Sequence, residues 1–287
     1  MLKALAEYVM RGRFQAISVA LLGSFFSLVS QAVIGLVTMR KGWLEGLLVT
    51  LWACLPPVLG VWLGDVPSSM VVASVGVLII NYLLSVILRY SGSWALALFA
   101  AVTLSSIVAF LIASFVVDLA VQTEGFFEGL MATPENADLD DTVLTLMQGW
   151  TTIRSSGLFA YWICLTTLLG MFVARWWQAQ LYNPGGFQQE FHSLRLPVVM
   201  ALVCMLAFGY CQSVGAEYDF WAGLFSLPLL VSGLGLLHQF IARYKLGVGG
   251  VISLYVILPF VSWVVIALAA IDSVIDLRKF LRFNQSS

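Results

Sequence analysis

The stretch VPSSMVVASVGVLIINYLLSVIL, residues 66–88, carries no charged side chain and is bounded by Asp65 and Arg89. A run of about 20 predominantly apolar residues is long enough to cross the hydrocarbon core of a bilayer as an α-helix. We therefore expect this stretch to be a membrane-spanning helix, with the polar side chain of Asn81 near mid-depth.

Similar apolar segments lie on both sides of this stretch and cover most of the 287-residue chain. The chain is 61% hydrophobic and 10% charged, with a mean hydropathy of +0.96, whereas soluble domains contain about 25% charged residues. The eight segments are residues 14–39, 43–63, 66–88, 93–121, 155–174, 196–213, 220–242 and 246–277. The sequence predicts an all-α, polytopic transmembrane helical bundle that forms a single integral membrane domain over residues 1–287.

The basic residues are distributed asymmetrically among the gaps between these segments. If the first and last segments each enter the membrane and return to the same side, every Lys and Arg except Arg154 falls on one side. If each segment instead crosses once, the bias disappears. Because cytoplasmic loops carry the excess of Lys and Arg, we expect about six full spans between two hairpin-like terminal segments, with both termini in the cytoplasm.

Both terminal segments contain residues that favour a reversal. The first contains Gly23 and Ser24, followed by polar side chains as far as Gln31, and the last contains Pro259 near its centre. A proline removes a backbone hydrogen bond and crowds the preceding helical turn. A single tilted crossing remains the alternative, because a straight helix over residues 14–39 would be about 39 Å long.

Two stretches between the segments are amphipathic. Residues 134–150 begin with Pro134 and acidic side chains and continue with an apolar stripe, which predicts a helix that lies on the outer face of the membrane or of the bundle. Residues 175–195 are predicted to be a cytoplasmic loop, in which Asn183-Pro184-Gly185-Gly186 is a strong turn signal.

Polar side chains in or near membrane spans are the default candidates for a functional site. Gln31 and Asn81 are candidates for lining a ligand cavity, and hydrogen bonding between helices is the alternative for each. Asp118 lies near the outer surface, where we expect a solvated or capping role. His238 lies near the cytoplasmic boundary, where an interfacial role is expected.

Asp272 and Asp276 are spaced four residues apart on the last predicted helix. Two carboxylates on one helical face could handle a proton or a cation. We favour a structural role, in which Asp276 pairs with Lys279 and Asp272 bonds an inner helix or a basic loop.

Other chemistries receive little support from the residues. Glu190, His192 and Arg195 resemble a cytoplasmic catalytic cluster, but no nucleophile motif, phosphate loop or zinc motif accompanies them. The four cysteines lie in apolar segments without metal-ligand spacing, so no metal or cofactor is predicted. A net charge of −1 provides no basic footprint for nucleic acid.

A face of small side chains, Ala16, Ala20 and Ser24, recurs every four residues in the first segment. Such a face allows close approach of another helix. The approaching helix can belong to a partner subunit or to the same chain, and the sequence favours neither.

Four stretches carry a resemblance to a known family: Arg11-Gly12-Arg13 before the first apolar segment, Thr38-Met39-Arg40-Lys41-Gly42, the run from Trp176 to Phe187, and the ending Asp272–Lys279. The central run is the most specific, and its characteristic residues are Trp176, Trp177, Tyr182, Asn183, Pro184, Gly185, Gly186 and Phe187. Together these stretches resemble the YybS-like family of bacterial inner-membrane proteins, and the resemblance covers most of the chain.

That family is distantly similar to the S-components of energy-coupling-factor transporters. The resemblance implies a multi-pass protein of the bacterial inner (cytoplasmic) membrane that binds a small molecule from outside and docks on a membrane coupling subunit. It also implies that Ala16 and Ala20 match the docking face on the first span of S-components.

The expected function is therefore small-molecule binding and transport by a subunit without its own ATPase. The alternative is a structural or assembly protein that docks a partner in the membrane. A membrane enzyme ranks third.

The topology can be tested by labelling single cysteines introduced into a cysteine-free form of the protein. A membrane-impermeant maleimide added outside should label Ala137→Cys and should not reach Gly185→Cys or Gln285→Cys, because the basic side is expected to be cytoplasmic. Labelling of Gln285→Cys in intact cells would contradict the C-terminal hairpin and indicate a single last span.

Overall fold

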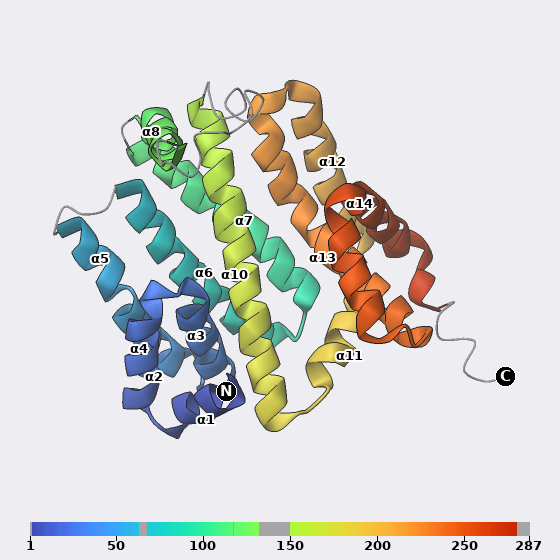
Figure 1. Cartoon of the computed structure of the whole chain (residues 1–287), viewed down its shortest axis with the longest axis horizontal. Helices are drawn as coiled ribbons and strands as arrows, with labels where there is room; N and C mark the ends of the chain where they lie inside the picture. The colour runs from blue at the N-terminus through green and yellow to red at the C-terminus, as the bar shows by residue number, and fades with distance from the viewer. Residues whose placement is uncertain (1, 63–67, 117, 132–149, 280–287) are drawn as a thin grey trace.

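The computed structural model describes residues 2–62, 68–116, 118–131 and 150–279 (Figure 1), and all regular secondary structure in this part of the chain is helical. Apart from Trp150, the predicted helix at 134–150 lies outside the described residues. The elements are α1 (Leu2–Arg11), α2 (Arg13–Leu22), η1 (Gly23–Phe25), α3 (Ser27–Lys41), α4 (Trp43–Ala53), α5 (Leu55–Trp62), α6 (Ser68–Ser91), α7 (Trp94–Phe115), α8 (Leu119–Met131), α10 (Thr152–Tyr182), α11 (Gly186–Ser193), α12 (Val198–Val214), η3 (Ala216–Tyr218), α13 (Asp219–Arg243) and α14 (Gly247–Ile275).

Six helical stretches in the described part are long and apolar enough to cross a membrane. They are Trp43–Gly60, Ser68–Ser91, Trp94–Phe115, Thr152–Tyr182, Ala216–Arg243 and Gly247–Ile275. A seventh candidate consists of α11 and α12, which are bent by 68° relative to each other. The prediction of an all-α, polytopic membrane bundle is confirmed, although the segment at 196–213 qualifies as a span only together with α11.

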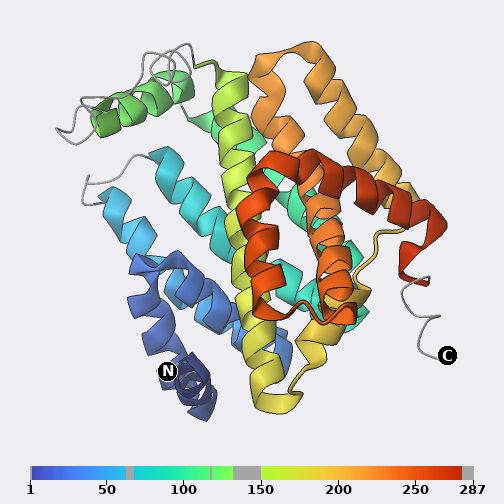
Figure 2. The same cartoon turned by 45° about the vertical axis from the view of Figure 1, so that its right-hand side comes forward.

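Helix α10 occupies the middle of the bundle in both views (Figures 1 and 2) and packs against α3, α6, α7 and α13. Its start is fixed by Thr151, whose hydroxyl accepts a hydrogen bond from the Arg154 N–H at 3.2 Å. Ser93 caps the start of α7 in the same way. Such caps satisfy N–H groups that have no partner within the helix.

Three segment boundaries differ from the sequence-based expectation. Helix α10 continues through Tyr182, so the first part of the expected loop at 175–195 is helical. The segment at 93–121 is interrupted before α8, where Asp118 has a left-handed φ of 54° and its carbonyl accepts the N–H of Gln122. The segment at 43–63 breaks at Cys54, next to two prolines that cannot donate backbone hydrogen bonds.

The first apolar segment forms a helical hairpin. Helices α2 and α3 pack against each other, and the Ser30 hydroxyl donates to the Ala20 carbonyl at 2.6 Å across the turn. At the other end of the hairpin, Arg13 at the start of α2 pairs with Glu45, just beyond the end of α3. The two helices are therefore antiparallel, and the predicted reversal at Gly23 is confirmed.

The last apolar segment also turns back. Helix α14 is kinked after Pro259, where Val261 has φ −119° and ψ 15°, and Figure 2 shows the second half bending away from the first. The beginning of α14 lines a cavity with His192, and Arg278, just beyond its end, donates to the His192 carbonyl. Both ends of α14 therefore lie beside α11.

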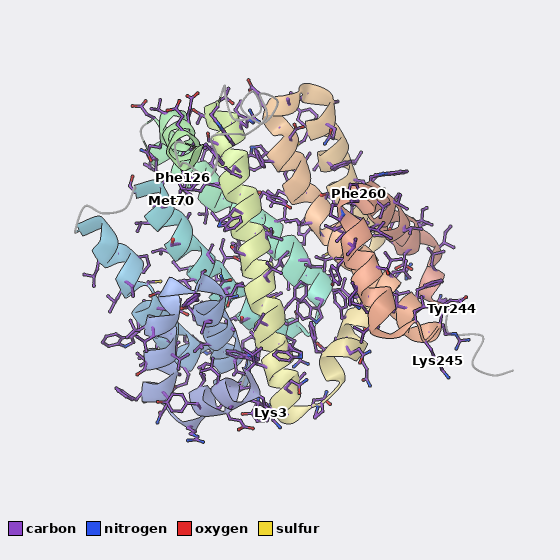
Figure 3. All side chains as sticks on the ribbon, viewed as in Figure 1. Lys3, Met70, Phe126, Tyr244, Lys245 and Phe260 are labelled. Carbon is purple, nitrogen blue, oxygen red and sulfur yellow. The ribbon has the colours of Figure 1, made fainter. Side chains whose placement is uncertain are left out.

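These two reversals place the basic residues at one end of the bundle. We call this the basic end: it is where α3, α6, α10 and α13 finish. Figure 3 shows Lys3 and Lys245 toward this end, and Met70 and Phe126 toward the opposite end. Arg154, at the start of α10, belongs to the opposite end. Apart from Arg154, the basic residues that the structure describes therefore gather toward one end of the bundle.

The small-residue face of α2 is used inside the chain. Ala16 is 1% exposed and Ala20 is 0% exposed, in a core shared with α3 and α4, and Ser24 is half-buried. Of the two alternatives left open by the sequence, the structure therefore shows the intramolecular contact. These alanines do not form an accessible docking face in this conformation.

Replacing Ala20 with leucine should lower the melting temperature of the detergent-solubilised protein. Overpacking a filled site of this kind costs roughly 1–3 kcal/mol. The matched control is Ala4→Leu, because Ala4 is exposed in α1. If Ala20→Leu and Ala4→Leu melted alike, α2 would not pack inside the chain.

Candidate functional site

Gln31 and Asn81 meet the central helix in a buried polar layer. Both are 0% exposed. The Gln31 amide donates to the Ser27 hydroxyl at 2.8 Å, and the Asn81 amide lies 3.4 Å from the Thr167 carbonyl of α10. A Cβ atom at Gly170 would lie 2.3 Å from the Gln31 amide oxygen, so only glycine allows this approach. The layer is tightly packed between helices.

A small hollow of about 230 Å³ adjoins this layer but is not lined by Gln31 or Asn81. Its lining residues are Ser24, Ser27, Ser30, Pro56, Pro57, Ser74 and Leu78. The hydroxyls of Ser24, Ser30 and Ser74 donate to carbonyls of Leu21, Ala20 and Met70. Ser24 and Ser30 therefore satisfy carbonyls at the end of α2, beside the break in the first apolar segment, as mid-depth backbone requires.

A larger cavity of about 470 Å³ lies at the end opposite the basic end. It is formed by the beginning of α6, by α8, which lies across this end (Figure 2), and by the first turns of α10. Its lining residues are Ser69, Met70, Gln122, Thr123, Phe126, Phe127, Leu158, Phe159 and Trp162. Figure 3 shows Met70 and Phe126 next to each other there.

The lining of this opposite-end cavity is mostly apolar and aromatic, with a few polar groups. The Ser69 hydroxyl donates to the Gln122 side-chain oxygen at 2.9 Å, and the Thr123 hydroxyl donates to the Leu119 carbonyl. Phe126 is 52% exposed and Trp162 is 59% exposed, so the cavity has an open apolar rim. Small-molecule sites commonly combine about 300–1,000 Å³ of apolar space with a few oriented polar groups.

At the basic end, the Asn183-Pro184-Gly185-Gly186 stretch forms the turn between α10 and α11. Asn183 ends α10, Pro184 follows, and Gly185 takes a left-handed φ of 85° that permits Gly186 to begin α11. Phe187 then packs against Trp94, Phe172 and Phe191 in an aromatic cluster.

Of the rest of the Trp176–Phe187 run, the two tryptophans pack within the protein, whereas Tyr182 and the three turn residues after it are exposed. Trp177 is 1% exposed, Trp176 is half-buried, and the Arg40 guanidinium lies 3.7 Å from the centre of the Tyr182 ring. The most specific stretch of the sequence therefore joins α10 to α11 and anchors the end of α3.

The three residues of the expected cytoplasmic cluster engage separate partners. Glu190 pairs with Arg175 and accepts from the Trp94 ring N–H at 3.1 Å. Arg195 donates to the carbonyls of Asp272 and Ser273, both at 2.8 Å. His192 lines a different cavity, together with His238. The structure does not bring these three side chains to one reacting centre.

A buried ion pair holds the end of α14. Arg278 Nε lies 2.8 Å from Asp272 Oδ2, with side chains 2% and 0% exposed. Arg278 also donates to the carbonyls of Ser232, at 2.9 Å, and His192. The sequence predicts that Asp272 bonds an inner helix or a basic loop. In the structure its carboxylate pairs with Arg278, six residues further on, and its backbone carbonyl accepts from Arg195.

The local backbone explains the pairing of Asp272 with Arg278. Asp276 ends α14 in a left-handed conformation with φ 56°, which reverses the chain and returns Arg278 toward Asp272. The Asp276 carboxylate lies 3.5 Å from Lys279, as expected, and 3.4 Å from Arg195.

The other polar candidates are dispersed. Asp118 precedes α8 at the opposite end, and its backbone carbonyl bonds the first turn of that helix. His238 Nε2 lies 3.2 Å from the Tyr255 hydroxyl near the basic end. Within the described ranges, no group of three or more His, Cys, Asp or Glu side chains could hold a metal ion.

Comparisons with known proteins identified no relative: no family model, no curated protein and no solved structure matches the chain. The resemblance to the YybS-like family therefore remains a prediction. The sequence alone does not reveal the opposite-end cavity, because the aromatic and aliphatic residues that line this cavity have the same composition as a lipid-facing surface.

Removing one partner of the buried ion pair should destabilise the protein strongly. Arg278→Met leaves the Asp272 carboxylate buried and uncompensated, which typically costs about 3–5 kcal/mol. Lys279→Met is the matched control, because Lys279 is 68% exposed and exposed pairs contribute only about 0–1 kcal/mol.

Thermal melts in detergent measure this difference. The double variant Asp272→Leu/Arg278→Met should melt above Arg278→Met, because it buries no lone charge. Equal melting temperatures for Arg278→Met and Lys279→Met would show that the ion pair does not hold α14.

Proposed function

We propose that the protein is a small-molecule-binding and transport subunit of a membrane system, and that it takes its ligand in the opposite-end cavity. The observation that carries this proposal is the cavity of about 470 Å³ between α6, α8 and α10. Its size falls in the range of small-molecule sites, and it lies between helices of a multi-pass bundle.

The lining favours a ligand that is mainly apolar or aromatic. Phe126, Phe127 and Trp162 present rings that bury large apolar areas and stack on planar groups. Ser69, Gln122 and Thr123 provide hydrogen-bonding groups on one side of the cavity. A planar molecule with one or two polar substituents fits this lining better than a highly charged one.

The charge distribution favours capture from outside the cell. The cavity and the basic residues are at opposite ends of the bundle, and Lys and Arg accumulate on the cytoplasmic side of membrane proteins. We therefore place the cavity at the outer face of a bacterial inner membrane, with both termini cytoplasmic. This orientation agrees with the resemblance to S-components.

A transport role would require a partner that supplies energy, because the sequence contains no nucleotide-binding motif. The resemblance implies a membrane coupling subunit for this purpose. Ala16 and Ala20 are buried against α3 and α4, so the partner would have to use a different surface of the protein.

Filling the cavity should remove a ligand that co-purifies with the protein. We expect native mass spectrometry to detect a bound small molecule on the parent protein, and Leu158→Trp to lower its affinity about tenfold, equivalent to about 1.4 kcal/mol. The matched control is Leu206→Trp, because Leu206 is 73% exposed on α12, away from the cavity.

A thermal melt of each variant confirms that it is folded. A bound molecule that is retained in Leu158→Trp, or lost equally in Leu206→Trp, would contradict binding in this cavity. A parent protein that carries no small molecule, purified from cells that express it naturally, would also contradict the proposal.

A further inference from the structure

A second cavity, of about 440 Å³, lies at the basic end between α11, α13 and α14. Its polar lining side chains are Gln188, His192, His238 and Lys245. Glycine and aliphatic residues from the end of α13 and the beginning of α14 complete the wall. This basic cavity is separate from the opposite-end cavity and shares no lining residue with it.

The basic cavity has the electrostatic character of an anion site. No carboxylate is among its lining residues. Lys245 forms no ion pair with a carboxylate in the part of the chain that the structure describes. Behind the wall, the Arg278 guanidinium donates to the His192 carbonyl. An anion in the cavity would face the Lys245 ammonium group and the hydrogen-bonding rings of two histidines, with no carboxylate in the lining.

The backbone turn after α13 places Lys245 at the cavity. Lys245 has a left-handed φ of 53°, and its N–H bonds the Ala242 carbonyl while the Leu246 N–H bonds the Ile241 carbonyl. This is the usual end of an α-helix in which glycine occupies the left-handed position. A lysine there places an ammonium group beside the carboxyl end of α13.

An apolar track leads away from the basic cavity along α14. Val248, Ile252, Val256 and Phe260 recur every four residues and are 75%, 59%, 65% and 79% exposed. The track ends at the bend after Pro259, and Figure 3 shows Phe260 well above Lys245. Twelve helical residues rise about 18 Å, close to the roughly 15 Å thickness of one leaflet of the hydrocarbon core.

We propose that the basic cavity binds the phosphate group of an anionic phospholipid whose acyl chain lies along this track on α14. The length of the track matches one leaflet, and its position places the headgroup at the membrane surface of the basic end. A free phosphate ion would use the lysine and histidines but not the exposed apolar side chains. Basic pockets between membrane helices on the cytoplasmic side commonly bind anionic headgroups.

The ligand can be tested on purified, delipidated protein by native mass spectrometry and thermal melting. Phosphatidylglycerol should bind and raise the melting temperature, whereas phosphatidylcholine with the same acyl chains should bind about tenfold more weakly. Millimolar inorganic phosphate should not displace phosphatidylglycerol. Equal binding of the two lipids would overturn the proposal, and displacement by phosphate would show a free-anion site instead.

Two variants test the headgroup and the track separately. Lys245→Gln should weaken phosphatidylglycerol binding about fivefold, whereas Lys279→Gln, at an exposed lysine of the same end, should leave it unchanged. Ile252→Ser should also weaken binding, in contrast to Ile107→Ser, which changes an exposed residue of α7. Equal losses in Lys245→Gln and Lys279→Gln would overturn the headgroup site. Equal losses in Ile252→Ser and Ile107→Ser would overturn the acyl-chain track.

Discussion

At mid-depth of the bundle, Gly35 of α3 and Gly170 of α10 remove the side chains that would otherwise hold these two helices apart. A Cβ atom at Gly35 would lie 2.6 Å from the Ala174 Cβ atom, and one at Gly170 would meet Gln31. Ser30 through Met39 are all buried as a result. A hairpin that stops within the membrane needs such a cover, because no water is available there for its open backbone groups.

The C-terminal reversal is held by a different interaction. The two halves of α14 are joined by a kink. At the returning end, Arg278 pairs with Asp272 and donates to carbonyls of α11 and α13, and Arg195 donates to the Asp272 carbonyl of α14. One reversal thus depends on close apolar packing and the other on a buried ion pair. Both reversals return the chain to the basic end. The basic cavity lies at that end, and the mostly apolar cavity lies at the opposite end.

The sequence predicted the class of fold and both reversals, because charge bias and helix-breaking residues are local signals. The sequence could not show whether a helix of the same chain or a partner subunit covers Ala16 and Ala20. A face of small residues indicates that some helix approaches closely, but it does not indicate which one. The sequence did not identify Arg278 as the partner of Asp272, because the left-handed turn at Asp276 that brings the two together reverses the chain within a few residues. The residues that line the opposite-end cavity form no recognisable sequence motif, because aromatic residues such as Phe126 and Trp162 are equally expected on a lipid-facing surface.

The docked, non-crossing hairpin of α2 and α3 is the central claim of this account. It is tested most directly by comparing the membrane sides of Arg11→Cys and Lys41→Cys, which flank the hairpin, in a cysteine-free background. The account predicts that a membrane-impermeant maleimide reaches neither cysteine in intact cells and reaches both after permeabilisation. Labelling of one cysteine but not the other in intact cells would show that the first segment crosses the membrane once.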